Sequence, residues 1–236
     1  MHNFIKGFAA VITMTAVLCS CGGGDVANIS LDTAQYETER ASVYAECPSF
    51  SFMKNKELQE NLNEVFREET DSRLIEFDTQ CETPGELVLG NKCVFEIHRD
   101  IKYNKNDFIS ILSDTYTYLG GAHGNTCWSA KNINVMSGTE IVLDDLFSDT
   151  GYKETLNRLI KEEVEENTEE YSDLWEKPEI KETNQTDFYI TDEGIVIFYQ
   201  PYDLSYYARG MVEFTLDWED LSGYLKEEYK RLLTEN

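Results

Sequence analysis

The chain has 236 residues, and its 45 acidic side chains outnumber 20 basic ones, which gives a formal net charge of -25 at neutral pH. A surface this acidic repels nucleic acids and anionic lipid headgroups, and it attracts cations and basic proteins. Charge of this sign also keeps ordinary secreted domains soluble, so alone it identifies no partner. The 14 tyrosines and 12 phenylalanines are enough to fill the core of one domain, or of two small ones.

The first twenty residues have the pattern of a leader. Lys6 precedes a mostly apolar run that ends in Leu18-Cys19-Ser20-Cys21, and three glycines follow. A short apolar run that closes on an aliphatic residue, a small residue and a cysteine is typical of a lipoprotein signal peptide. The alternatives are a plain secretory signal and a transmembrane anchor, which needs about 20 apolar residues. We predict that residues 1–20 are removed, that lipid is attached to Cys21, and that the mature chain lies in the bacterial cell envelope, in the periplasm or on the cell surface.

Four further cysteines remain in the predicted mature chain: Cys47, Cys81, Cys93 and Cys127. An even number of cysteines in an oxidising compartment predicts two disulfides, with three possible pairings. Cys81 and Cys93 flank a Pro-Gly loop and are natural partners, which leaves Cys47 and Cys127 by elimination. Zinc is the rival explanation, but no C-x-x-C pair occurs, and we expect neither a metal nor a cofactor.

The spacing of apolar residues changes several times in the first half of the mature chain. Residues 21–40 are polar and are expected to form a tether. Residues 42–52 have a strand pattern interrupted by Pro48, which predicts an edge strand. From the N-cap residue Asn55, apolar side chains recur at helical spacing to about residue 77. From Cys93 the period becomes two, with turns at residues 104–107, 120–121 and 137–138, which predicts an antiparallel sheet up to residue 143.

The second half begins with a helix that Thr150 is expected to cap and that has a very acidic polar face. A hairpin is predicted over residues 187–200, a last strand over residues 212–216, and a final helix after its cap Asp217. Helices that alternate with runs of antiparallel strands indicate the α+β class, with helices packed on one face of each sheet. We predict two small subdomains, residues 41–103 and 104–236.

The first candidate site is Gly120-Gly121-Ala122-His123-Gly124-Asn125. Gly121 and its neighbours allow positive φ, so an exposed loop would present His123 and Asn125 to a ligand. The alternative is a hairpin whose glycines serve its geometry alone. No G-x-S-x-G, H-E-x-x-H, Walker or EF-hand motif occurs, and a histidine without an acid or nucleophile near it is weak support for catalysis. The sequence therefore favours a protein without catalytic residues.

The second candidate site is an irregular connection near residues 198–210. It gathers Tyr199, Tyr202, Tyr206, Tyr207 and Arg209. Tyrosine and arginine are enriched in recognition surfaces, so we expect these side chains to bind a ligand. The alternative is a packed aromatic plug in which the arginine satisfies buried carbonyl groups.

These two segments carry a family likeness. One half runs from Tyr116-x-Tyr118 through the glycines and on through Ser137-Gly138 to Leu143-Asp144-Asp145-Leu146-Phe147. The other half contains Phe198-x-x-Pro201-Tyr202 and Tyr207-Ala208-x-Gly210. Together they resemble the C-terminal extracytoplasmic domain of the RsiV-type anti-sigma factors, a domain of unknown function that also occurs beside peptidoglycan deacetylase domains. Residues 42–103 resemble the smaller domain that commonly precedes it.

The resemblance implies an α+β fold and a non-catalytic role in the envelope, and in its anti-sigma branch it implies binding of lysozyme. Lysozymes are basic, which suits an acidic surface. We expect a lipid-anchored module that recognises a lysozyme-like or another basic protein, or the glycan of peptidoglycan, and that binds no nucleic acid. Its lipid is the expected contact with the membrane. The alternative is an enzyme that acts on envelope polysaccharide, with His123 as general base or metal ligand.

Overall fold

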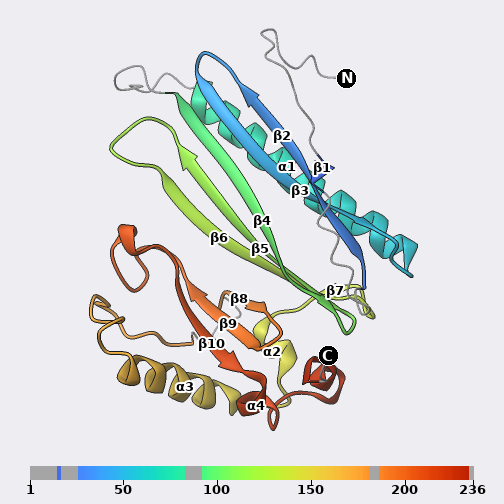
Figure 1. Ribbon diagram of the computed structural model, residues 1–236, viewed down its shortest axis with the longest axis vertical. Coiled ribbons are helices and arrows are strands. Elements are labelled where there is room, and N and C mark those ends of the chain that lie inside the picture. Colours follow the sequence, from blue (N-terminus) through green and yellow to red (C-terminus); the bar gives the residue numbers. More distant parts are fainter. Residues whose placement is uncertain (1–14, 17–25, 83–91, 181–185, 234–236) are drawn as a thin grey trace. The chain divides into compact units, whose positions relative to one another are not determined.

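The structure, a computed structural model, describes residues 15–16, 26–82, 92–180 and 186–233, and it divides into two compact units (Figure 1). Unit 1 comprises Met1–Asp100 and Ser113–Cys127, and unit 2 comprises Ile101–Leu112 and Trp128–Asn236. This division differs from the predicted boundary at residue 103, because the long strands β4 (Cys93–Lys105), β5 (Phe108–Tyr118) and β6 (Asn125–Asn134) contribute residues to both units. Cys21 and most of the predicted leader lie outside the described residues.

The larger sheet has the strand order β1 to β7, and unit 1 contains β1, β2, β3 and parts of β4, β5 and β6. Its first strands are β1 (Thr15–Ala16), β2 (Asn28–Glu37) and β3 (Ala41–Ser51). The tether predicted up to residue 40 is therefore too long, because β2 already pairs with β3 in antiparallel register. The edge position predicted for β3 is also wrong, since β3 lies between β2 and β4. Pro48 is tolerated there because pairing with β4 ends at Ala45.

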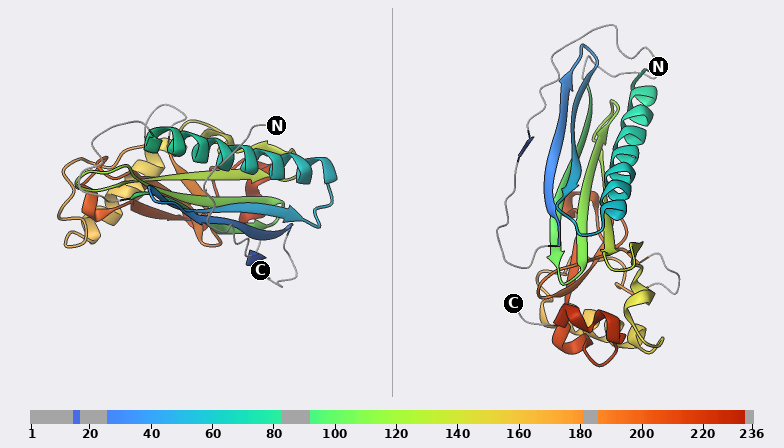
Figure 2. Two further views of the ribbon diagram at one scale, coloured as in Figure 1. Left: turned by 90° about the horizontal axis from the view of Figure 1, so that it is seen from above. Right: turned by 90° about the vertical axis from the view of Figure 1, so that its right-hand side faces the viewer.

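Strands β3 and β4 pair in parallel, which the sequence did not predict. A parallel pair needs a crossover, and α1 (Lys56–Glu82) supplies it. The predicted cap is confirmed, because the Asn55 side-chain oxygen accepts a hydrogen bond from the Leu58 amide at 3.0 Å. The helix runs along one face of the long strands (Figure 2) and packs against β3. Its buried rings meet those of the sheet: the centroids of Phe77 and Phe95 are 5.1 Å apart.

Unit 2 holds a second, antiparallel sheet in the order β10 (Val212–Asp217), β9 (Gly194–Tyr199) and β8 (Phe188–Ile190). The predicted hairpin and last strand are thereby confirmed, and the α+β class holds. The short β7 (Thr139–Glu140) pairs with β6. The helices are α2 (Leu143–Leu146), α3 (Tyr152–Glu166), α4 (Trp218–Leu221) and two 3-10 segments, Tyr207–Arg209 and Glu227–Leu233.

The core of unit 2 lies between α3 and β10, which pack together, and includes Leu156, Ile197 and Phe214. Two predictions about helix ends are wrong. The cap position of α3 is Gly151 rather than Thr150, and the final helix is one turn followed by a 3-10 segment.

Candidate functional site

The glycine loop, residues 119–125, connects β5 to β6 in unit 1. The Tyr118 hydroxyl donates to the Gly121 carbonyl at 3.0 Å and accepts from the Gly121 amide at 3.3 Å, which closes the turn. Gly120 has a φ of 91° and Gly121 a φ of 150°, values that favour glycine. A Cβ on Gly124 would lie 2.4 Å from the Tyr116 ring. Geometry alone therefore explains these glycines.

The predicted contact residues Gly121, His123 and Asn125 are exposed on this loop. Nδ1 of His123 lies 2.7 Å from the Gly124 carbonyl oxygen, so that nitrogen carries the proton in this contact. Across the described ranges, no group of three or more His, Cys, Asp or Glu side chains is arranged to hold a metal ion. The loop thus offers an exposed imidazole without a metal-ligand set around it.

The tyrosine segment, residues 199–210, belongs to unit 2. Its first member, Tyr199, is a correction to the predicted surface, because this ring is only 6% exposed and packs edge-on against Phe214. Every residue of β9 is buried, so buried and exposed side chains do not alternate along this strand and Tyr199 does not face the solvent. Burial and the nearby Glu179 and Asp203 raise the pKa of Tyr199, and its hydroxyl has no hydrogen-bond partner among the described residues.

Tyr202 occupies a position that usually requires glycine. The Asp203 amide donates to the Gln200 carbonyl at 3.0 Å, Pro201 is second in this turn, and Tyr202 follows with a φ of 74°. Proline followed by a positive φ is the signature of a type II turn, whose third position prefers glycine. Strain of this kind persists where surrounding contacts impose it, commonly at binding sites. The turn leaves Tyr202 54% exposed, with its ring centroid 5.7 Å from that of Tyr207.

Arg209 points into the protein. Its Nη1 donates to Oδ1 of Asp173 and to the Glu170 carbonyl, both at 2.6 Å, and its guanidinium lies 5.6 Å from the Tyr171 ring centroid. Four-fifths of the arginine side chain is covered, since 20% is exposed. These contacts support the plug alternative for this residue: Arg209 clamps the tyrosine segment to residues 170–175.

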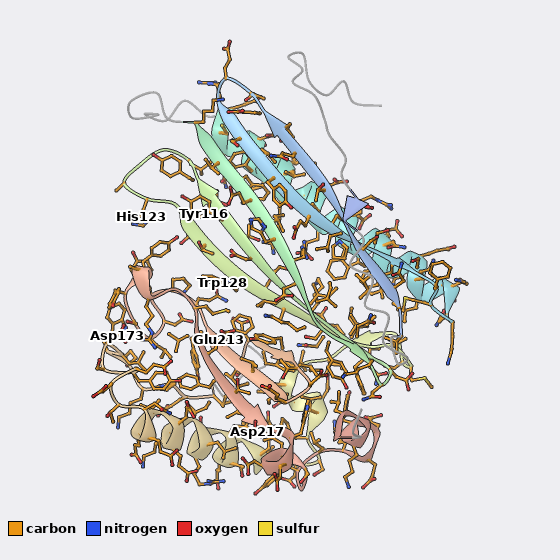
Figure 3. The ribbon with its side chains drawn as sticks, viewed as in Figure 1. Tyr116, His123, Trp128, Asp173, Glu213 and Asp217 are labelled. Atoms are coloured by element: carbon orange, nitrogen blue, oxygen red, sulfur yellow. The ribbon has the colours of Figure 1, made fainter. Side chains whose placement is uncertain are left out.

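Asp173, labelled in Figure 3, is the centre of this clamp. Ser205 Oγ donates to its Oδ2 at 3.0 Å, and Tyr206 also bonds to the carboxylate. Desolvation opposes ionisation of Asp173, but these hydrogen bonds and the charge of Arg209 outweigh it and lower the pKa of the carboxyl. The carboxylate is therefore held in its charged form between the two segments.

Three large aromatic side chains remain exposed beside this clamp. Tyr202, Tyr206 and Trp175 are 54%, 50% and 54% exposed, and we call them the aromatic patch. The Trp175 amide donates to the Leu204 carbonyl at 2.9 Å, which joins the two segments. Trp175 was not predicted from the sequence, because it lies in a stretch with no periodicity and is joined to the tyrosine segment by a tertiary hydrogen bond of its backbone.

Gln200 fixes the base of the tyrosine segment to β6. Its side-chain amide imitates a peptide group: Oε1 accepts from the Trp128 amide at 2.9 Å, and Nε2 donates to the Trp128 carbonyl at 2.8 Å. Nε2 also lies 3.1 Å from Oδ2 of Asp187. Trp128 is labelled in Figure 3. The side chain therefore occupies hydrogen-bonding groups of β6 that another strand would otherwise use.

The cysteine pairs predicted from the sequence have different outcomes. All four described cysteines are thiols in this structure. Cys81 and Cys93 lie together, whereas Cys47 is on β3 and Cys127 on β6, with β4 and β5 between them. Three strand spacings amount to about 14 Å, and disulfides need Cα atoms within about 7 Å. The predicted pairing of Cys47 with Cys127 is therefore wrong.

Two known families match different parts of the chain. The family described as "Protein of unknown function (DUF3298)" matches residues 144–219, and the family "Deacetylase PdaC" matches residues 34–126. The anti-sigma-V factor RsiV of Bacillus subtilis (strain 168) is 24% identical over 200 residues, which cover 81% of this chain and 68% of RsiV. The peptidoglycan-N-acetylmuramic acid deacetylase PdaC of the same organism is 26% identical over 125 residues, but these cover only 27% of that enzyme.

Solved structures share the fold. A DUF3298-family protein of Bacteroides fragilis superposes with a TM-score of 0.69 at 18% identity, covering 88% of this chain and 97% of that one. A DUF3298-family protein of Pseudomonas aeruginosa gives a TM-score of 0.59 at 13% identity, with 94% and 97% covered. These likenesses confirm the α+β fold. With its PdaC-type region followed by a DUF3298 region, the chain is similar to the RsiV-type, DUF3298 proteins along most of its length.

Proposed function

We propose that this chain is an extracytoplasmic binding module of the bacterial envelope, anchored by lipid on Cys21, and that it recognises a lysozyme-like basic protein. The lipoprotein pattern of the leader and the family likeness support this location. None of the helices described combines the length and the apolar character that a membrane span requires. The proposal treats binding, rather than catalysis, as the activity of the module.

The aromatic patch is the observation that carries the proposal. Tryptophan and tyrosine supply a large share of binding energy at interfaces because they bury much area and lose little side-chain freedom. Here the two segments that present them are fixed by the Asp173–Arg209 clamp, so little ordering cost remains for binding.

Charge around the patch favours a cationic partner. The exposed acids near the patch residues in the sequence include Glu169, Glu170, Glu176 and Asp203, against the exposed base Lys177. An acidic rim attracts a basic protein and accelerates its encounter, and exposed rings can also receive lysine or arginine side chains. The alternative ligand is a cell-wall glycan, because sugar rings also pack against aromatic faces, and the enzyme alternative depends on His123 of the glycine loop.

The first experiment is binding of the lipid-free mature chain to lysozyme, titrated across salt concentration. Binding that survives physiological salt supports the proposal, whereas binding that disappears there reflects only the attraction of opposite charges. We expect Trp175→Ala to weaken binding about tenfold or more without changing the melting temperature, and Tyr206→Phe, which keeps the exposed ring, to weaken binding less.

Phe52→Ala is the matched control, since Phe52 is 83% exposed and belongs to unit 1, outside the patch. An equal loss of affinity in the control would show that the aromatic patch is not the binding site. Patch-dependent binding of peptidoglycan fragments, without binding of lysozyme, would replace the protein ligand by a glycan. Turnover of those fragments that is lost in His123→Ala would favour the enzyme alternative.

A further inference from the structure

We propose that Cys81 and Cys93 are a disulfide-forming pair that fastens the end of α1 to the start of β4. This inference concerns unit 1 alone and does not depend on ligand binding. It relies on the proposed extracytoplasmic location only for its oxidising environment.

Cys81 and Cys93 both contact one backbone carbonyl, the first through its thiol and the second through its amide. Sγ of Cys81 lies 3.8 Å from the Arg40 carbonyl oxygen, and the Cys93 amide donates to the same oxygen at 2.8 Å. The thiols also hydrogen bond to each other. Cys81 is 6% exposed and Cys93 is fully buried, in one apolar cluster with Phe77 and Phe95. The backbone of both elements thus already holds the sulfur atoms side by side.

The other two cysteines provide an internal contrast. Sγ of Cys47 lies 3.9 Å from the carbonyl oxygen of the next residue, Pro48, and Cys127 is on a strand that is not a neighbour of β3. Within the described ranges no third ligand joins Cys81 and Cys93 in a metal-binding group. A two-sulfur pair without further ligands fits a disulfide rather than a zinc site.

The reaction is an exchange with the disulfide of an extracytoplasmic thiol oxidase, for which oxidised glutathione can stand in. One thiolate attacks a sulfur of the oxidant, the oxidant's S–S bond breaks, and a mixed disulfide forms. The second thiolate then attacks the cysteine sulfur of the mixed disulfide and releases the oxidant's other sulfur. The two cysteines are oxidised, the oxidant is reduced to two thiols, and these thiols take up the two protons.

Access decides when this reaction occurs. Burial and the neighbouring Cys93 thiol raise the pKa of Cys81 to about 12, so little of it is thiolate in the folded, reduced chain. The bond therefore forms during folding, before the apolar cluster closes. Closing a loop of about a dozen residues removes disorder from the unfolded chain, and for a chain of this size we expect reduction to lower the melting temperature by about 6–12 °C.

Trypsin digestion places each of the four cysteines in a different peptide. Cleavage after lysine and arginine places Cys47, Cys81, Cys93 and Cys127 in the peptides 41–54, 74–92, 93–99 and 106–131. The full chain is refolded in a glutathione buffer, alkylated in denaturant without reductant, digested and analysed by mass spectrometry. We expect peptides 74–92 and 93–99 to be joined, with the mass of two hydrogens missing. Separate, alkylated forms of these two peptides, or a link from either to another peptide, would overturn the proposal.

The same digest of protein extracted from cell envelopes tests the location separately. Joined peptides in buffer, but alkylated ones from cells, would support the pair and contradict the extracytoplasmic location. The double variant Cys47→Ser/Cys127→Ser retains Cys81 and Cys93. Reduction should therefore lower its melting temperature by the same amount, about 6–12 °C. An unchanged melting temperature in that variant would overturn the fastening role, even if Cys81→Ala/Cys93→Ala fails to fold.

Discussion

Replacing Gln200 by alanine tests how the tyrosine segment is held. The substitution removes both hydrogen bonds to the Trp128 backbone, at 2.9 and 2.8 Å. A neutral hydrogen bond contributes about 0.5–1.5 kcal/mol net, so two of them together amount to about 2 kcal/mol at this half-buried site. At about 2–4 °C per kcal/mol for a chain of this size, we expect the melting temperature to fall by about 4–8 °C. Scanning calorimetry measures it, and amide exchange at Trp128 should accelerate.

Gln200→Glu is the matched variant, because it keeps the shape and changes one donor into an acceptor. The new oxygen faces the Trp128 carbonyl and the Asp187 carboxylate, so the pKa of the introduced carboxyl rises above its unfolded value of about 4.3. A carboxyl with a raised folded pKa stabilises the fold only while it is protonated. The Gln200→Glu variant should therefore be less stable at pH 7 than at acidic pH, and it should regain stability as the pH falls through the raised pKa.

Equal melting temperatures of both variants and the wild type at pH 7 would refute the role assigned to Gln200. Unchanged exchange at the Trp128 amide would also refute this role, because that amide would then have another hydrogen-bond partner. If Gln200→Ala loses stability but Gln200→Glu shows no pH dependence, the loss comes from packing and not from the hydrogen bonds.

Three further substitutions are informative. Arg209→Ala should lower the melting temperature by roughly 4–8 °C, because the clamp to Asp173 and Glu170 is lost; an unchanged melting temperature with weaker ligand binding would make Arg209 a contact residue instead. Tyr202→Gly should weaken ligand binding and leave stability within about 1 kcal/mol, because relief of the positive φ offsets the lost ring contact, and urea unfolding measures this. Gly194→Ala should destabilise by about 3 kcal/mol or more by urea unfolding, because the new Cβ would lie 1.9 Å from the Leu216 carbonyl oxygen; a milder effect would show that β9 and β10 separate easily.

Periodicity predicted the elements whose apolar residues recur regularly. The helix after Asn55 was found because leucines and phenylalanines follow a period near four, and the strand that begins at Cys93 because burial alternates along its first half. Strand β2 was missed because its polar residues resemble a tether, although Ile29 and Leu31 already alternate. The parallel β3–β4 pair was not predicted. The succession of a strand, a helix and a strand could have indicated it, but the hairpins that follow suggested an entirely antiparallel sheet.

The candidate site was predicted only in part, for a physical reason. Tyrosines 202 and 206 are exposed as expected, since their segment is short and irregular. The inward direction of Arg209 depends on Asp173, which lies 36 positions away, and no local pattern reports such a contact. Trp175 is missed for the same reason. The burial of Tyr199 had a local signal, namely the unbroken apolar run of β9 that precedes it.

The parallel pairing of β3 with β4 also determines the order in which unit 1 can fold. The hairpin of β2 and β3 and the helix α1 form from neighbouring residues, but Ala41 and its partner Cys93 are separated by the whole crossover. Closing a loop of about 50 residues costs about 3.5 kcal/mol of chain entropy. The hairpin must therefore wait, with one edge unpaired, until the chain has emerged as far as Ile97. A fragment that ends before that strand leaves this edge open to other chains, so proteolysis within the crossover favours aggregation over a smaller folded core.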